Sequence, residues 1–171
     1  YLFLGRFWKS GMNKIKSFFH LIWFEFCRTI LRIIFYPLYR IKATGKENIP
    51  RKGPVIILSN HQSFFDPMFC QLPTWRHMHY VARSTLFDIK GFGWLISTLN
   101  TIPIRRGEAD VKAMKKIIEV LKKGEMVCLY AEGTRTSDGR IADIKPGFGL
   151  LSRRGKATVV PVVIDGAYEC W

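Results

Sequence analysis

The chain has 171 residues, of which 48% are hydrophobic and 23% are charged. A chain of this length and composition can bury a sizeable core in one compact domain, which argues against intrinsic disorder. The formal net charge of +14 does not choose a fold, but it favours an anionic partner: phosphate head groups, nucleic acid or a negatively charged substrate.

The four cysteines, Cys27, Cys70, Cys128 and Cys170, lie far apart and show no paired spacing. The sequence therefore indicates neither a disulfide framework nor a zinc site, and we expect buried thiols in a reducing compartment. No secretory signal is recognisable, which predicts a site that faces the cytoplasm. The chain begins at Tyr1 without a methionine and stops at Trp171, so we expect it to be cut short at both ends.

Residues 14–39 are the most apolar and aromatic part of the chain. Glu25, Arg28 and Arg32 lie near the middle of this segment, and each costs about 2.5–3.5 kcal/mol at a bilayer centre, against about −0.3 to −0.6 kcal/mol for each large apolar residue. The two sums nearly cancel, which argues against a transmembrane helix. At about 100° per residue, the polar side chains share one narrow wedge and apolar side chains cover most of the remaining circumference. The wedge consists of Lys14, Glu25, Arg28, Thr29, Arg32 and Tyr36.

This pattern predicts an amphipathic helix in the membrane interface, with its apolar flank among acyl chains and basic residues near anionic head groups. The alternative is a core helix of a soluble domain, although so wide an apolar face needs more partner surface than a short chain supplies. Residues 42–52 are polar and contain glycine and proline, as expected of a linker. We therefore divide the chain into a membrane-associated helical segment with linker, residues 1–45, and a second domain, residues 46–171.

From residue 54 onward, short β-branched runs alternate with helical patterns. Buried strands are predicted at residues 55–58, 79–82, 126–130 and 158–164, and a short apolar strand precedes Arg105. A helix is predicted to open at Pro67, and the clearest helix covers residues 108–123, with apolar side chains on one face and lysines opposite. Such alternation predicts an α/β domain with a mostly parallel central sheet flanked by helices.

Residues 59–67, Ser-Asn-His-Gln-Ser-Phe-Phe-Asp-Pro, lie between a predicted strand and a predicted helix. Side chains at this end of a sheet line the cleft of α/β proteins. His61 can take a proton from an alcohol if a carboxylate on its other ring nitrogen fixes the tautomer, and Asp66 is near enough in sequence to do so. The alternative role of Asp66 is that of an ordinary helix N-cap, which the spacing alone does not exclude.

Two further segments follow predicted strands and carry arginine. In residues 130–136, Tyr-Ala-Glu-Gly-Thr-Arg-Thr, glycine lets backbone amides converge on an anion, and arginine can bind phosphate through two hydrogen bonds. In residues 101–107, Arg105 and Arg106 end a short apolar strand. Because the carboxyl ends of parallel strands share one face, we expect both clusters to converge on one anionic group. The alternatives are a hairpin turn with an exposed arginine and a surface charge pair.

Taken together, four short blocks resemble, in order, those of the glycerolipid acyltransferase family that includes the 1-acylglycerol-3-phosphate acyltransferases. The blocks are Asn60-His61 with Asp66, residues 102–107, Glu132-Gly133-Thr134-Arg135 and residues 159–162, and Lys145-Pro146-Gly147 is similar to a Lys-any-Gly step that often follows the third. The match covers roughly residues 46–166. It departs from the family pattern at Arg105, where an acidic residue is common, at Tyr130 and Ala131, where Phe and Pro are usual, and at Thr136, a frequent Ser.

The resemblance implies a membrane-associated enzyme of phospholipid biosynthesis. Such an enzyme transfers a fatty acyl group from acyl-CoA or acyl carrier protein to the free hydroxyl of a lysophospholipid, with 1-acyl-glycerol-3-phosphate as the first expectation and phosphatidate as its product. It implies that His61 is the general base, oriented by Asp66. The implied acceptor-phosphate ligands are Arg106, Glu132, Gly133, Thr134 and Arg135. For Glu132 we favour a role in orienting an arginine, because a free carboxylate beside phosphate would repel it. Neither a cofactor nor a metal is expected.

Three alternatives remain open at the level of sequence. In the first, the acceptor is another lysophospholipid and the reaction is acyl transfer or transacylation. In the second, the domain is a catalytically inactive module that binds anionic lipids. Ser63, Cys70 or Cys128 as a nucleophile is a minor alternative. Nucleic acid is not expected as a partner, because the aromatic residues are concentrated in an apolar helix and are not interleaved with basic residues on a strand face.

Overall fold

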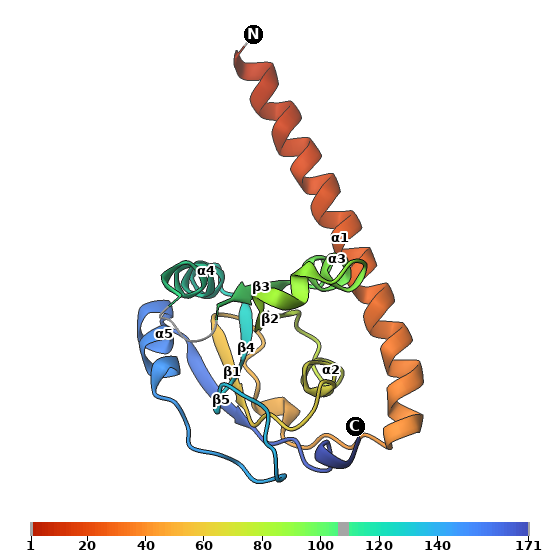
Figure 1. The fold of residues 1–171 in the computed structure, drawn as a ribbon. Coiled ribbons are helices and arrows are strands. Elements are labelled where there is room, and N and C mark those ends of the chain that lie inside the picture. Colours follow the sequence, from red (N-terminus) through yellow and green to blue (C-terminus); the bar gives the residue numbers. More distant parts are fainter. Residues whose placement is uncertain (1, 106–109, 171) are drawn as a thin grey trace. The chain divides into compact units, whose positions relative to one another are not determined.

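The structure is a computed structural model and describes residues 2–105 and 110–170 (Figure 1). The chain divides into two compact units, Tyr1–Arg40 and Ile41–Trp171. The sequence pattern placed its division later, after residue 45. Residues 41–45 therefore belong with the second unit, which contains the sheet.

The first unit contains one helix, α1 (Leu2–Tyr39). It ends at the residue expected from the sequence but begins earlier than residue 14. Pro37 lies in its last turn; proline has no amide donor and its ring crowds the carbonyl four residues earlier, so its position agrees with the end of the helix two residues later. Glu25 and Arg28, three residues apart, form an ion pair on this helix. Among the helices in the described part of the chain, none combines the length and the hydropathy needed to cross a bilayer.

The second unit is built on a five-stranded sheet with the strand order β3-β2-β4-β1-β5. All four neighbouring pairs of strands are parallel, which confirms the predicted α/β class. The predicted strands agree with the observed ones to within one or two residues at each end, but the last of them, predicted to be buried, is a partly exposed edge strand. The strands are β1 (Val55–Ser59), β2 (Met78–Arg83), β3 (Thr101–Ile104), β4 (Met126–Tyr130) and β5 (Thr158–Val162).

Alternate residues of the central strands feed two separate cores, one on each face of the sheet. Val55 and Ile57 pack on the face that carries Cys70 of α2 (Asp66–Gln71). Ile56 packs on the opposite face, where α4 (Val111–Lys122) and α5 (Gly147–Gly155) lie (Figure 1). Because successive side chains of a strand point to opposite faces, a strand covered on both sides reads as an unbroken apolar run. This explains the run of residues 55–58.

Two helices were not anticipated from the sequence. α3 (Phe92–Thr98) is short and follows Gly91, which has a positive φ, while α5 contains Gly147, Gly149 and Gly155. Glycine is a poor helix former, so neither segment carries a recognisable helical signal. The start of the helix predicted at residues 108–123 lies partly outside the described residues, and α4 is described from Val111. Short 3-10 helices cover Lys46–Asn48 in the expected linker, Ser84–Asp88 and Tyr168–Cys170.

Candidate active site

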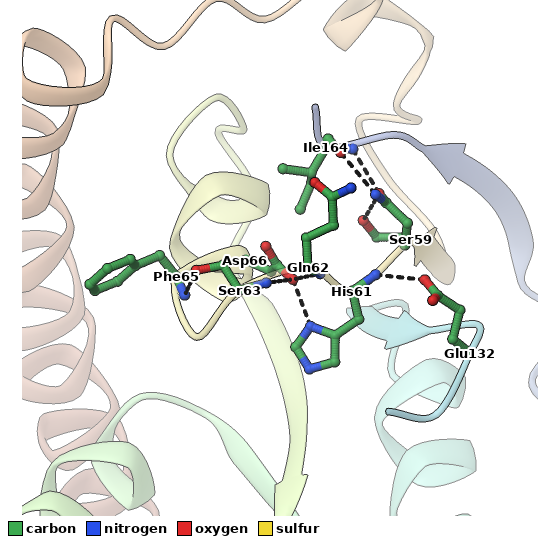
Figure 2. Close-up of polar contacts among 9 residues, drawn as sticks. Ser59, His61, Gln62, Ser63, Phe65, Asp66, Glu132 and Ile164 are labelled. Atoms are coloured by element: carbon green, nitrogen blue, oxygen red, sulfur yellow. Dashed lines mark hydrogen bonds and ion pairs between the residues drawn. The ribbon is translucent and has the colours of Figure 1, made fainter. Parts of the chain in front are cut away.

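The candidate site forms where β1 and β4 end side by side. The parallel register pairs Ser59 with Tyr130, the last residues of the two strands. His61 and Glu132 each lie two residues beyond one of these strand ends. The backbone amide of His61 donates to the Glu132 carboxylate over 2.8 Å (Figure 2). The strand register therefore brings together the first and third sequence blocks, which are 71 residues apart.

His61 is held by the carboxylate of Asp66. Nδ1 of the imidazole lies 2.6 Å from Oδ2 of Asp66, and that oxygen also accepts from the backbone amides of Gln62 (2.6 Å) and Ser63 (2.9 Å) (Figure 2). Asp66 is fully buried, and the side chain of His61 keeps 13% of its surface exposed. Because a carboxylate can only accept, Nδ1 carries the imidazole proton. Nε2, on the opposite side of the ring, is therefore left as an acceptor.

The contacts of Asp66 differ from those of a helix N-cap. Asp66 is the first residue of α2, Phe65 is the N-cap residue, and no side chain caps the helix. The Asp66 carboxylate instead binds amides that precede the helix, in the loop that carries His61. The alternative reading of Asp66 as an ordinary N-cap is therefore wrong for this structure.

The Tyr130 ring lies flat against His61. The two ring centroids are 3.9 Å apart and the planes differ by 13°. The phenol oxygen is buried, and burial raises the pKa of Tyr130 well above its usual value, with nearby Cys128 adding to the effect. Tyr130 therefore remains a neutral phenol at any pH at which the protein works. From the sequence, Tyr130 was known as the first residue of segment 130–136 and as a departure from a family pattern. Its contact with His61 follows from the strand register that pairs it with Ser59, which the sequence does not show.

The carboxylate of Glu132 binds backbone amides in two separate loops. It is 3% exposed; one carboxylate oxygen accepts from the amide of His61, and the other accepts from the amide of Ala142 over 3.1 Å. The amide of Thr136 donates to the carbonyl of His61 over 2.8 Å. The expected role of Glu132 was to orient an arginine or to bind phosphate, whereas these contacts fix the main chain that carries His61.

Arg135 reaches the loop of the first block. Its guanidinium carbon lies 3.5 Å from the centroid of the Phe64 ring, a cation–π arrangement. The ammonium group of Lys145 lies close to Gly133, because a Cβ built on Gly133 would lie 3.0 Å from its Nζ. Gly133 has a φ of +73°, which favours glycine, and both Gly133 and Thr134 are exposed. An ammonium group therefore lies beside the exposed backbone of residues 133–134, and the guanidinium of the next residue, Arg135, lies over Phe64.

The remaining predicted phosphate ligand, Arg106, lies outside the described residues. Its neighbour Arg105 is described, and the backbone amide of Arg105 donates to Asp110, the N-cap residue of α4, over 2.9 Å. The sequence-based expectation that Arg106 converges on the same anion as Arg135 thus stays an expectation.

Asn60 is a residue of the first block whose role the sequence did not show. Its amide nitrogen donates to the carbonyl of Ile164, and its amide oxygen accepts from the Ile164 backbone amide, both over 2.8 Å. This pair explains why β5 ends at Val162 and not at residue 164 as predicted: the backbone groups of Ile164 bind the Asn60 side chain instead of a neighbouring strand. Asn60 thereby fixes the loop of His61 to the edge strand.

The alternative nucleophiles are poorly placed. Ser63 is fully buried, and its hydroxyl accepts from the amide of Phe65 over 3.2 Å. Cys70 and Cys128 are buried, and a hydrogen bond with Cys70, together with burial, raises the pKa of the Cys128 thiol well above its usual value. Since the thiolate is the reactive form, Cys128 is unreactive. Within the described residues, no group of histidine, cysteine, aspartate or glutamate side chains has the arrangement of a metal site.

The second unit is thus a parallel α/β domain in which a histidine held by a carboxylate lies at the ends of two central strands. Comparison with known proteins shows the family to which it belongs. The model of the Acyltransferase family matches residues 40–165, and the chain belongs to that family.

Several proteins resemble the chain. It is 34% identical over 137 residues to the chloroplastic 1-acyl-sn-glycerol-3-phosphate acyltransferase LPAT1 of Arabidopsis thaliana, and the aligned region covers 78% of this chain and 38% of the relative. It is 28% identical over 144 residues to the 1-acyl-sn-glycerol-3-phosphate acyltransferase of Bacillus subtilis, covering 84% of this chain and 71% of that protein. The crystal structure of the 1-acyl-sn-glycerophosphate acyltransferase from Thermotoga maritima superposes with a TM-score of 0.60 at 31% identity, over 72% of this chain and 49% of that one. The chain thus spans well under half of the plant relative and about half of the solved structure.

Proposed function

We propose that this chain is the catalytic part of an acyltransferase that esterifies the free hydroxyl of 1-acyl-glycerol-3-phosphate and yields phosphatidate. The observation that carries the proposal is the contact between His61 and Asp66, which leaves Nε2 of a partly exposed imidazole as an acceptor. The names of the relatives support the choice of acceptor. Acyl-CoA or acyl carrier protein supplies the acyl thioester, and no cofactor takes part.

In the proposed reaction, Nε2 of His61 takes the proton from the acceptor hydroxyl as that oxygen attacks the thioester carbonyl. A carbon–oxygen bond forms, the carbon–sulfur bond of the resulting tetrahedral intermediate breaks, and the imidazolium returns its proton to the leaving thiolate. Asp66 keeps the proton of the neutral imidazole on Nδ1 and stabilises the positive charge that His61 gains. No covalent intermediate with the protein is needed, which agrees with the buried positions of Ser63 and Cys128.

The acceptor phosphate is assigned to the exposed turn of residues 133–134 and to the cations beside it. Arg135 offers a planar guanidinium held against Phe64, and Lys145 places an ammonium group over Gly133. Arginine binds phosphate through two parallel hydrogen bonds, and an ammonium group adds charge without a fixed geometry. Arg106 is retained as a further phosphate ligand on the strength of the sequence match. Bound in this way, the phosphate sets the distance between the acceptor hydroxyl and His61.

Membrane association at the cytoplasmic surface is the second part of the proposal. Many large apolar side chains of α1 are exposed, among them Phe18, Phe19, Ile33 and Leu38. Exposed apolar area of this extent is favourable in contact with acyl chains, and the net charge of +14 favours anionic head groups. Flotation with vesicles tests this: Phe19→Asp combined with Ile33→Asp should leave the protein unbound, and undiminished binding by this variant would contradict the role of α1.

The activity is tested by the release of free thiol from acyl-CoA or acyl carrier protein in the presence of lysophospholipids in mixed micelles. The parent chain should release thiol with 1-acyl-glycerol-3-phosphate and form phosphatidate. His61→Gln should lose transfer by about a thousandfold or more, since loss of general base catalysis adds to loss of the correctly placed ring. Full transfer by purified His61→Gln would overturn the assignment, and vesicle binding without turnover by the parent would favour the inactive lipid-binding module.

The phosphate assignment has its own test. Arg135→Ala should raise KM for the acceptor with a smaller change in kcat, because it removes binding that the ground state and the transition state share. Arg153→Ala removes an equal charge from the last turn of α5 and serves as the matched control. An equal rise in KM for both variants would show a general charge effect and would refute a phosphate site at Arg135.

A further inference from the structure

We infer that Tyr130 is a positioning residue for His61 and acts through the face of its ring, which holds the imidazole plane and stabilises the imidazolium that forms when His61 takes a proton. The kinetic part of this inference rests on the proposed function. The part that concerns the basicity of His61 does not, because it is measurable in the protein without substrate.

The first step of the argument is geometric. The hydrogen bond from Nδ1 to Asp66 fixes one atom of the imidazole but leaves the ring free to tilt about that contact. The parallel Tyr130 ring, at a centroid distance of 3.9 Å and an angle of 13°, blocks that tilt from one face. Two contacts of different kinds thus define both the position of the ring and its plane. A defined plane gives Nε2 a defined direction, which a base needs in order to meet an acceptor hydroxyl.

The second step concerns which part of Tyr130 acts. Its phenol oxygen is buried and has no hydrogen-bond partner among the described residues. Burial keeps the phenol neutral, so the hydroxyl neither gives up a proton nor carries charge. The contact with His61 is made by the ring. A phenylalanine ring would provide the same face, whereas an aliphatic side chain of similar volume would not.

The third step is electrostatic. The charged groups that contact His61 in the described part of the chain are the carboxylate of Asp66, on the imidazole, and that of Glu132, on its backbone amide. The Arg135 guanidinium is engaged over Phe64. The electron-rich face of Tyr130 adds an attraction that exists for the imidazolium and is weak for the neutral imidazole. It therefore favours the protonated form of His61, which is the form that develops in the transition state.

The experiment follows the pKa of His61 by NMR titration of the imidazole carbon-bound protons in the protein without substrate, with the signal assigned by its loss in His61→Gln. Tyr130→Leu should lower this pKa by roughly 0.5–1 unit, as expected for loss of a cation–π contact. Tyr130→Phe, the conservative variant, should return the pKa to near the parent value. In the transfer assay, Tyr130→Leu should lower kcat by about three- to tenfold with little change in KM, and Tyr130→Phe should recover most of that loss.

A second set of variants keeps the shape of the ring, so that the test does not depend on the folding of Tyr130→Leu. Phenylalanine and its mono-, di- and trifluorinated analogues, placed at position 130, have nearly the same size but a progressively weaker negative face. The pKa of His61 should fall steadily along the series if the ring face stabilises the imidazolium. A constant pKa across the series would overturn the inference, even with an inactive His61→Gln. A steady fall together with an active His61→Gln would instead uphold the stacking effect and refute the proposed base.

Discussion

Replacement of Asp66 by Asn tests the proposed mechanism most directly, because it removes one negative charge and little volume. Oδ2 of Asp66 contacts Nδ1 of His61 and two backbone amides within 2.9 Å, and the group is fully buried. An asparagine oxygen can still accept from the amides of Gln62 and Ser63. What it cannot provide is attraction for the imidazolium, nor a strong preference for a proton on Nδ1.

The magnitude follows from Coulomb's law. Charge centres about 4 Å apart at an effective dielectric constant of about 20 attract by about 4 kcal/mol. That energy is present when His61 is protonated and absent when it is neutral, so its loss raises the barrier for proton removal by nearly the same amount. At about 1.4 kcal/mol for each tenfold change, kcat should fall by about a thousandfold. KM for the acceptor should change little, because the phosphate contacts are elsewhere.

The assay is thiol release with saturating acceptor, measured from about pH 5 to pH 9, with thermal unfolding as a check on the fold. Asp110→Asn is the matched control: it makes the same acid-to-amide change at the N-cap of α4, where asparagine caps as well as aspartate. We expect Asp110→Asn to retain parental kcat. If folded Asp66→Asn kept kcat within tenfold of the parent, or if its main effect were on KM, the reasoning about His61 and Asp66 would be refuted.

Three further predictions concern stability. Gly155→Ala should lower the free energy of unfolding by about 1–3 kcal/mol, since the new Cβ would lie 2.6 Å from Cδ1 and 2.8 Å from Cβ of buried Leu121. The control, Gly149→Ala, lies in the same helix with open space at its Cβ and should be neutral or stabilising in urea unfolding. Equal losses in both variants would contradict the packing argument. Arg76→Ala should lower the free energy of unfolding by about 2–4 kcal/mol, because the guanidinium donates to the carbonyls of Pro50 (2.7 Å), Gly53 (2.7 Å) and Gly124 (2.8 Å). An unchanged urea midpoint would show that these hydrogen bonds make no net contribution to stability. Burial lowers the pKa of His79, against the opposing hydrogen bond to Glu125. The neutral imidazole is therefore compatible with the folded state above its unfolded pKa of about 6.5, and stability is lost as the pH falls below that value. The urea midpoint should drop more steeply below about pH 6.5 in the parent than in His79→Gln, and parallel curves would refute the assignment.

The fold was predictable where one physical signal dominated. The unbroken apolar run of residues 55–58 indicated a strand buried on both faces, and the lysine-backed apolar face within residues 108–123 indicated a surface helix. α3 and α5 were missed because glycines interrupt them, and their helical state depends on packing against the sheet and its neighbours, which no local pattern reports. The order of the strands, with β1 between β4 and β5, is likewise a property of the assembled sheet.

At the site, the sequence suggested that His61 meets Asp66, because both lie in one loop between a strand and a helix. It did not show which oxygen of Asp66 would take three donors, nor that Glu132 would bind the amide of His61. The contact between Tyr130 and His61 depends on the register of two strands, and a shift of one residue would turn that ring to the other face of the sheet. Contacts of this kind follow from tertiary structure and not from spacing.

The double hydrogen bond between Asn60 and Ile164 has a practical consequence for shortening this domain. A chain that stopped at Val162 would keep every strand of the sheet, and its circular dichroism would remain close to that of the longer chain. It would nevertheless lose both hydrogen bonds between the Asn60 side chain and the backbone of Ile164, next to His61 in the chain. Boundaries chosen from secondary structure alone would therefore leave the loop of His61 without this anchor, and residues 163 and 164 have to be kept in any shortened domain.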